Sequence, residues 1–228
     1  ARWHGELLLL AFEALPVRRP VNPLAARLDR YDPMSGRLEE SRTAALQLTD
    51  LASCPDGTVL ASGEPVAFED GTGIRVLGSL LTRVHPERFE PFEPLELPAQ
   101  GAPSAGATDL ELDPECRVAY LLAGRQAFSF DLERRRWRRL PAAGDALAVD
   151  PSGQVLYVAD GDTLRALRLG TGEVVTVATG LPAVTRMAVT PDRRIVMRGD
   201  RELALGVIDL ATGAAQRLAE GYGTHGRW

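Results

Sequence analysis

The sequence predicts an all-β fold, a β-propeller of about five four-stranded blades, and three observations lead to this prediction. A unit of roughly 40 residues recurs along the chain. Within each unit, short apolar segments alternate hydrophobic and polar residues, as half-buried strands do. No window keeps apolar residues at the helical period, so we expect almost no helix.

The first half of the repeat is an apolar segment, a turn containing proline and a second apolar segment. Its four copies surround Pro55, Pro114, Pro151 and Pro191, which are 59, 37 and 40 residues apart. A Pro-Asp or Pro-Ser-Gly sequence supplies a turn between two strands. We therefore expect two antiparallel strands around each proline, the first of them innermost in its blade.

The second half of the repeat is a hairpin marked by glycine. Copies at 28–38, 164–174 and 207–213 place a glycine where a hairpin turn needs positive φ. A weaker copy lies at 128–137, and residues 80–90 hold a degenerate copy in the second blade. Prolines between residues 86 and 106 predict an extended surface loop there, and a second insertion is expected at 15–26.

We assign residues 1–228 to one propeller domain, with blades at roughly 1–44, 45–104, 105–142, 143–181 and 182–228. Residues 5–10 resemble the second strand of a repeat, so the first blade lacks its innermost strand. Pairing of N- and C-terminal segments would remove two exposed sheet edges. We therefore predict that the tail at 222–228 closes the propeller by pairing with the first blade.

Composition and charge limit the classes of function. Hydrophobic residues make up 45% and charged residues 25% of the chain, values typical of a soluble globular protein. The net charge is −5, so nucleic acid and acidic membranes are not expected partners. No apolar stretch is long enough for a membrane span. All 26 basic residues are Arg, which we attribute to coding bias.

Two segments resemble the repeats of a known family. Residues 155–160 (Val-Leu-Tyr-Val-Ala-Asp) and 207–213 (Val-Ile-Asp-Leu-Ala-Thr-Gly) are similar to repeats of YVTN/NHL-type bacterial β-propellers. The resemblance is good over 107–220 and fainter over 27–106. It implies blades and no particular reaction, because the wider group includes binding and sensor modules, scaffolds, lactonases and lyases. Many members have more blades than this chain predicts.

A polar ring is expected beside the central axis, where the innermost strands begin. Loops between second and third strands open on the same face. Function has to be argued from such sites and not from the fold. The ring residues are Thr49, Asp50, Thr108, Asp109, Asp145 and Arg186, and the loop candidates are Arg125, Asp160, Asp162, Asp200 and Glu202.

Two interpretations of this ring stay open. Its carboxylate and backbone oxygens suit a hard cation such as Ca²⁺, or a small polar ligand. The interpretation we favour is that Asp and Thr at strand ends satisfy backbone donors. The spacing of His4, His85 and His225 predicts no metal site, and no nucleophile elbow, phosphate loop, dinucleotide motif or CxxC is present. We assign no catalytic residue and no metal ligand, and Ca²⁺ is the one candidate cofactor.

Cys54 and Cys116 fall in the first turns of two adjacent blades. They are either bridged or two buried free thiols, which behave as small hydrophobes. A disulfide would favour an extracytoplasmic location. The compartment is otherwise open.

The strongest charge feature is an outer hairpin with five arginines in six positions: Arg134, Arg135, Arg136, Trp137, Arg138 and Arg139. It suits an acidic partner or a phosphate backbone, with Trp137 stacking on the ligand. Alternatively, half of the arginines face solvent, the others pair with carboxylates, and the charge protects an exposed sheet edge.

The leading interpretation is a non-catalytic binding or scaffold module that recognises a protein partner through its loops and this charged hairpin. The alternative is a propeller enzyme of the hydrolase, lactonase or lyase type that binds a small ligand or metal at the axial ring. A third interpretation is that the chain is one module of a longer protein.

Overall fold

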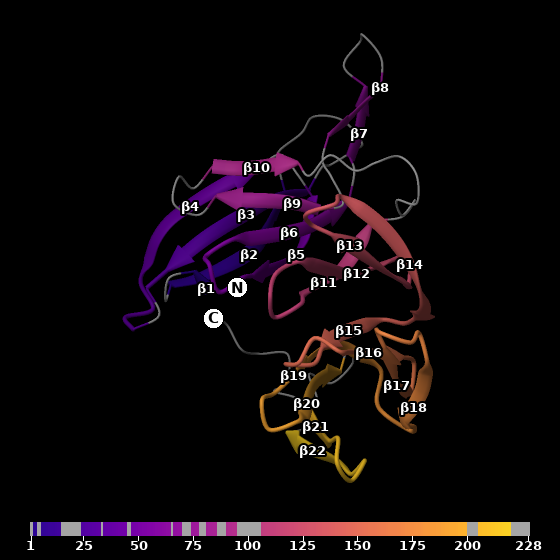
Figure 1. The fold of residues 1–228 in the computed structure, drawn as a ribbon. Helices are drawn as coiled ribbons and strands as arrows, with labels where there is room; N and C mark the ends of the chain where they lie inside the picture. The colour runs from indigo at the N-terminus through magenta and orange to yellow at the C-terminus, as the bar shows by residue number, and fades with distance from the viewer. Residues whose placement is uncertain are drawn as a thin grey trace.

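The computed structural model describes residues 2–3, 6–14, 24–32, 34–44, 47–64, 66–69, 74–77, 81–85, 90–94, 106–199 and 205–219. Every regular element in these ranges is a β-strand, so the all-β prediction is confirmed. Within them there is no helix of the length and apolarity that crossing a membrane requires. The strands form five four-stranded sheets and one two-stranded hairpin (Figure 1).

The first two sheets come from the N-terminal half of the chain. The first has the order β1-β2-β3-β4 and contains β1 (Arg2–Trp3), β2 (Glu6–Ala14), β3 (Leu24–Tyr31) and β4 (Leu38–Ala44). The second has the order β10-β9-β6-β5 and contains β5 (Gln47–Ser53), β6 (Val59–Glu64), β9 (Leu81–His85) and β10 (Glu90–Pro94). The two-stranded hairpin joins β7 (Val66–Glu69) and β8 (Ile74–Leu77).

In the last three sheets, the strands follow one another in chain order. The third contains β11 (Ala107–Leu112), β12 (Val118–Ala123), β13 (Gln126–Asp131) and β14 (Arg136–Ala143). The fourth contains β15 (Ala146–Val149), β16 (Val155–Asp160), β17 (Thr163–Arg168) and β18 (Val174–Ala178). The fifth contains β19 (Val184–Val189), β20 (Arg194–Gly199), β21 (Leu205–Asp209) and β22 (Ala215–Ala219).

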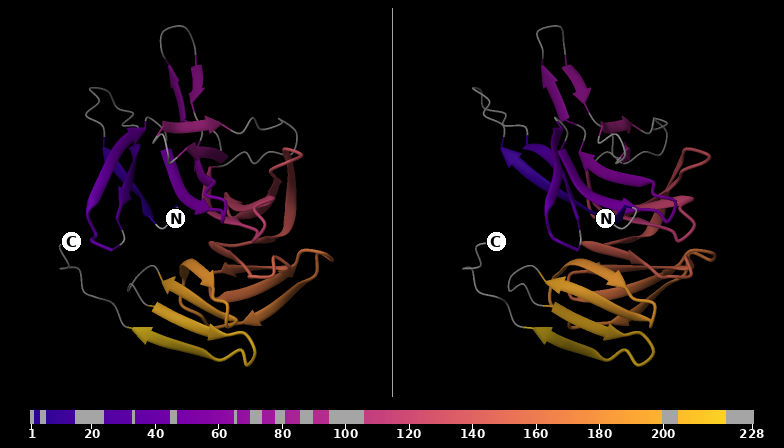
Figure 2. Two further views of the ribbon diagram at one scale, coloured as in Figure 1. Left: turned by 60° about the vertical axis from the view of Figure 1, so that its left-hand side comes forward. Right: turned by 90° about the vertical axis from the view of Figure 1, so that its left-hand side faces the viewer.

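Successive sheets pack side by side as blades of a propeller, in a curved row that runs from β1–β4 to β19–β22 (Figure 2). The prediction of about five blades needs a correction, because complete blades number four in the described part of the chain. In the first sheet, residues 6–14 occupy the second-strand position, and β1 pairs with β2 only at Arg2 and Trp3. The predicted closing strand, 222–228, lies outside the described residues.

The second blade departs from the repeat. The degenerate copy predicted at 80–90 supplies β9, which pairs with β6 as the third strand. The loop predicted at 86–106 is wrong for residues 90–94, because these form the outer strand β10 on β9. The β7–β8 hairpin, which the sequence analysis missed, lies between β6 and β9 in the chain and projects from the top of the molecule in Figure 1.

Each junction between the complete blades holds a hydrophobic core, because alternate residues of a strand face opposite sides of its sheet. On β12, Ala119 and Leu121 pack toward the second sheet, in a cluster with Leu60. Tyr120 and Leu122 pack the other way, with residues of the fourth sheet. A third cluster, which includes Tyr157 and Met187, fills the junction of the fourth and fifth sheets.

Cys54 and Cys116 form a disulfide with a Cα–Cα distance of 5.8 Å. Of the two states left open by the sequence, the bridged one is therefore the state of this structure. The bond joins the β5–β6 turn to the β11–β12 turn and so fastens the second blade to the third.

Gly144 shows how closely two blades approach at the axial face. It lies between β14 and β15, and its backbone N–H donates to the Arg125 carbonyl oxygen at 2.8 Å. A Cβ at this position would stand 2.1 Å from the carbonyl oxygen of Ala159. Only glycine allows this approach, which sets the start of the innermost strand β15 and the position of Asp145.

Candidate functional site

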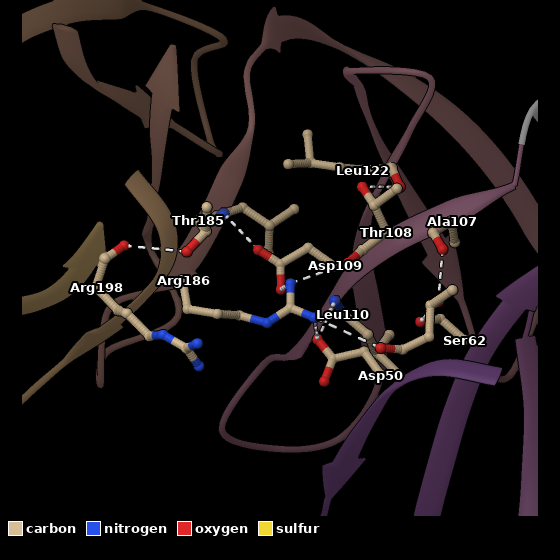
Figure 3. A network of polar contacts seen from close by, with 12 residues as sticks. Asp50, Ser62, Ala107, Thr108, Asp109, Leu110, Leu122, Thr185, Arg186 and Arg198 are labelled. Atoms are coloured by element: carbon tan, nitrogen blue, oxygen red, sulfur yellow. Dashed lines mark hydrogen bonds and ion pairs between the residues drawn. The ribbon is translucent and has the colours of Figure 1, made fainter. Parts of the chain in front are cut away.

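Each of the innermost strands β5, β11, β15 and β19 has one residue pair of the predicted ring at or near its start. These pairs are Thr49-Asp50, Thr108-Asp109, Asp145-Ala146 and Thr185-Arg186. Figure 3 shows that the side chains of Asp50, Asp109 and Arg186 converge. The threonine hydroxyls instead donate hydrogen bonds mainly to backbone carbonyl oxygens. We call Asp50, Asp109 and Arg186 the axial triad.

The two aspartates of the triad bind the backbone of the next blade. One carboxylate oxygen of Asp50 accepts a hydrogen bond from the Leu110 N–H at 3.1 Å. In the same way, Asp109 accepts one from the Leu147 N–H at 2.8 Å. The fourth blade has Ala146 at the equivalent position, so this chain of contacts stops there.

Arg186 reaches from β19 across the axis to the second and third blades (Figure 3). Its Nη1 donates to the Asp109 carboxylate and to the Thr108 carbonyl oxygen, both at 2.9 Å. Its Nη2 lies 3.7 Å from the Asp50 carboxylate and donates to the Thr49 carbonyl oxygen at 3.5 Å. A single guanidinium therefore connects three blades.

The ring threonines serve the backbone. Thr49 Oγ1 donates to the Ala107 carbonyl oxygen at 2.5 Å and lies 3.1 Å from the Ser62 hydroxyl. Thr108 Oγ1 donates to the Leu122 carbonyl oxygen at 3.4 Å. These contacts are those expected of hydroxyls that satisfy stray backbone acceptors.

Glu111 belongs to this site and was missed by the sequence analysis. It lies two residues after Asp109 on β11, so both side chains point to the same face of the strand. Among the described residues it has no hydrogen-bonding or ion-pair partner, although it interacts electrostatically with the whole triad. Strand alternation from Asp109 was the signal that predicts its position.

Burial controls the protonation of these carboxyls. The pKa of Asp109 is raised to about 7, mainly by burial and in addition by the nearby Asp50, while Arg186 opposes the rise. Burial also raises the pKa of Glu111 to about 8, with Asp109 and Asp50 adding to the effect. The charged forms are costly because the protein interior solvates them poorly.

The loop candidates form a second, separate network. The Asp145 carboxylate forms an ion pair with Arg125 at 2.9 Å and accepts a hydrogen bond from the Gly161 N–H at 3.1 Å. It makes no such contact with the axial triad. Arg125 also contacts Asp160 at 2.6 Å, and Asp160 contacts Arg165 at 2.5 Å. The Asp162 carboxylate accepts a hydrogen bond from the Thr163 hydroxyl at 3.0 Å. Asp200 and Glu202 lie outside the described residues.

The ring residues do not fit the Ca²⁺ that the sequence analysis considered. Ca²⁺ needs six or more oxygen ligands around one point. Here the point between Asp50 and Asp109 is filled by the cationic guanidinium of Arg186. In the part of the chain that the structure describes, no three His, Cys, Asp or Glu side chains are grouped in a way that would hold a metal.

The arginine-rich hairpin divides into two sets. Arg134 pairs with Asp131 at 3.0 Å, and Arg139 donates to Gln126 at 2.8 Å. The other three arginines are exposed and have no hydrogen-bonding or ion-pair partner among the described residues: Arg135, Arg136 and Arg138. We call these three the arginine edge, because β14 is the outermost strand of its sheet.

Trp137 does not stack on a ligand, which corrects that part of the sequence interpretation. It is 9% exposed and packs on Phe130 and Phe128, with ring centroids 4.7 and 6.4 Å away. Its indole nitrogen is buried without a hydrogen-bond acceptor among the described residues. Strand alternation explains the difference, because Trp137 faces the sheet interior while Arg136 and Arg138 face outward.

Comparison with known proteins supports the fold and no single family. No protein-family model and no curated protein sequence matches the chain. Among solved structures, a calcium-binding regucalcin from Agrobacterium tumefaciens matches with a TM-score of 0.63 and 13% identity, over 87% of this chain and 69% of its own. U3-55K matches with a TM-score of 0.59 and 12% identity, over 77% of this chain and 53% of its own.

The WD40 repeats of RRP9 match similarly, with a TM-score of 0.58 and 12% identity, over 77% of this chain and 52% of theirs. The chain thus spans about half the length of these two WD40-type structures. Such low identities show the fold, a β-propeller, and leave the ligand open. The resemblance to YVTN/NHL repeats is not confirmed by a family match.

Proposed function

We propose that the protein is a non-catalytic propeller module that binds an acidic protein partner through the arginine edge. The observation that carries this proposal is a group of three exposed arginines without a partner among the described residues: Arg136 and Arg138 on the outer strand β14, and Arg135 in the turn just before it. Arginine at a rigid surface binds carboxylates through two parallel hydrogen bonds. Because the chain as a whole carries a net charge of −5, the positive charge of the arginine edge contrasts with the rest of the protein.

The buried face of the same strand supports this function. Trp137 and Leu140 are buried, and β14 pairs with β13 from Asp131 to Gln126. The arginines are therefore mounted on a fixed backbone, which lowers the ordering cost of binding. Arginine is also among the residues that are enriched at protein–protein interfaces.

The axial ring gives less support to the enzyme alternative. Asp50, Asp109 and Arg186 use their polar atoms to connect blades. A hydrolase or lyase needs a nucleophile or a general base free to reach substrate. Among the described residues, Glu111 is the one carboxyl at the ring without a hydrogen-bonding or ion-pair partner. A ligand role of the ring would be tested with the double variant Asp50→Asn, Asp109→Asn, which should then lose ligand binding.

The disulfide supports an extracytoplasmic location as part of the same proposal. Disulfides persist in oxidising compartments and are rare in the cytosol. Free Cys is absent among the described residues, because both cysteines of the chain are bridged.

The test is a direct binding measurement with a defined acidic probe. The triple variant Arg135→Gln, Arg136→Gln, Arg138→Gln is compared with the wild type for binding of a fluorescein-labelled decaglutamate peptide by anisotropy. We expect at least tenfold weaker binding at physiological salt, since each lost charge-assisted contact contributes roughly 1 kcal/mol or more.

A matched control carries three substitutions at exposed arginines that already have carboxylate partners: Arg117→Gln, Arg168→Gln and Arg194→Gln. This control has the same net charge as the test variant and should bind the peptide as the wild type does. Equal weakening in both variants, or unchanged binding in the test variant, would show that the arginine edge is not the binding surface. Preference for duplex DNA over the peptide would point to nucleic acid instead.

A further inference from the structure

On the face opposite the axial ring, the turns between the first and second strands of the third and fourth blades lie against the preceding blade. The equivalent turn residue has a positive φ in three successive blades: Cys116 (53°), Gly153 (68°) and Arg193 (60°). In the first of these junctions, Cys116 is bonded to Cys54. In the second, a Cβ on Gly153 would stand 3.0 Å from Pro114. Both junctions are closed.

The third junction is open. A cavity of about 410 Å³ lies between the β15–β16 turn and the β19–β20 turn, with Pro151 and Arg193 both in its wall. Arg193 stands at the position that Gly153 holds in the preceding blade, and its side chain lines this cavity together with Pro151. The volume is that of a small-molecule site.

The wall of this cavity combines an apolar surface with unused donors. Val155, Val189 and Leu210 supply apolar surface. Tyr157 also lines it and is 8% exposed, and its hydroxyl has no hydrogen-bond partner in the described part of the chain. Arg193 is exposed and has no carboxylate partner there either. The hydroxyl itself is accessible at the cavity wall, so a ligand there can accept its hydrogen bond.

Asp150 is the one carboxylate in the wall, and its oxygens are already used. One oxygen accepts the Gln154 and Val155 N–H groups, each at 2.8 Å, and the other accepts the Ser152 hydroxyl and N–H. These contacts hold the carboxylate in its own turn. Arg193 is therefore left as the charged group able to contact a ligand.

We propose that this cavity binds a small organic carboxylate. Arg193 and the Tyr157 hydroxyl would hold the carboxylate group, and Val155, Val189 and Leu210 would contact its apolar body. The planar guanidinium matches a carboxylate with two parallel hydrogen bonds. The apolar walls favour an organic acid over inorganic phosphate, because burying them adds to the affinity.

The electrostatics of Tyr157 agree with a donor role. Burial raises the pKa of its hydroxyl, and the negative charge of Asp150 raises it further, against the opposing effect of Arg193. The phenol therefore keeps its proton at neutral pH and can donate it in a hydrogen bond. The opposing effect of Arg193 also shows that its charge acts at the hydroxyl.

The test is calorimetric titration of the whole protein with benzoate and with hexanoate. We expect binding of at least one of these acids. Arg193→Gln should weaken it at least tenfold, and Tyr157→Phe at least threefold, since the phenylalanine keeps the ring and removes only the donor.

Arg194→Gln is the matched control, because it removes the same charge at the neighbouring position, whose side chain pairs with Asp192 and is absent from the cavity wall. It should bind as the wild type does. Absence of binding of both acids, unchanged binding in Arg193→Gln, or equal loss in Arg194→Gln would overturn the proposal. Equal affinity for benzamide or for inorganic phosphate would overturn it as well, because the site would then not read an organic carboxylate.

Discussion

Single residues at equivalent positions of the repeat decide what each blade does at the axis. Asp50 and Asp109 accept hydrogen bonds from the backbone of the next blade in the chain, whereas Ala146 at the equivalent position cannot. Arg186, at the same position of the fifth sheet, instead contacts Asp109 in an earlier blade. Four copies of one strand start thus give two kinds of contact and one position that makes neither. The repeat itself specifies only where these side chains stand.

Glu111 gives a prediction about pH. Its pKa is about 8 in the folded protein and 4.5 in an unfolded chain, so between these values the folded state holds a proton that the unfolded state has released. The free energy of unfolding should therefore fall as the pH rises from about 5 to 8, by less than about 1.4 kcal/mol per pH unit. Asp109, with a pKa raised to about 7, acts in the same direction.

The measurement is urea unfolding at several pH values for the wild type and for Glu111→Gln. The variant cannot titrate at this position, so its stability should depend less on pH over the same window. An identical pH dependence in the two proteins would contradict the assignment of a half-buried Glu111 that holds its proton in the folded state.

At the scale of the element, the turn between the first and second strands of a blade also takes part in the contact between adjacent blades. The disulfide closes a loop between positions 62 residues apart, and it removes entropy from the unfolded chain. We expect Cys54→Ser with Cys116→Ser to lower the free energy of unfolding by roughly 2–4 kcal/mol. Urea unfolding with and without a thiol reductant measures this effect.

Reduction supplies the control for that prediction. The wild type should lose stability in reductant and approach the double variant, which should not respond. A double variant as stable as the oxidised wild type would mean that the junction between the second and third blades is held by its hydrophobic core alone.

Strand alternation was the most reliable guide at this scale. It places Trp137 inside and Arg136 and Arg138 outside, as the structure does. The stacking role for Trp137 was one of two interpretations of this hairpin, and the burial of Trp137 favours the other, which rested on strand alternation. The β7–β8 hairpin was missed because its two strands are short and interrupt a repeat copy.

At the scale of the whole molecule, Arg186 joins blades that are far apart in the sequence. Replacing it with Met would leave the Asp109 side chain, which is 4% exposed, without its cation. Because the Arg186 side chain is 42% exposed, we expect a loss of about 2 kcal/mol in the free energy of unfolding, below the roughly 3–5 kcal/mol of a fully buried ion pair. Hydrogen exchange should quicken first in β19 and β20, because these strands lose their link to the second and third blades.

Arg168→Met is the comparison for this prediction. Its ion pair with Glu173 is exposed, with 62% and 50% of the two side chains accessible, so its loss should cost less than about 1 kcal/mol. Equal effects of the two substitutions would show that Arg186 is an ordinary surface arginine and not a cross-axis link.

The sequence by itself determined the class of fold, the repeat unit and the strands of residues 106–199, because alternation and turn residues are local properties. It also placed the two cysteines in the first turns of adjacent blades, where the structure joins them by a disulfide. Only the tertiary structure decided that Arg186 fills the ring, that Glu111 joins it and that one junction is open at Arg193. These features depend on distances between residues of different blades, which no local pattern encodes.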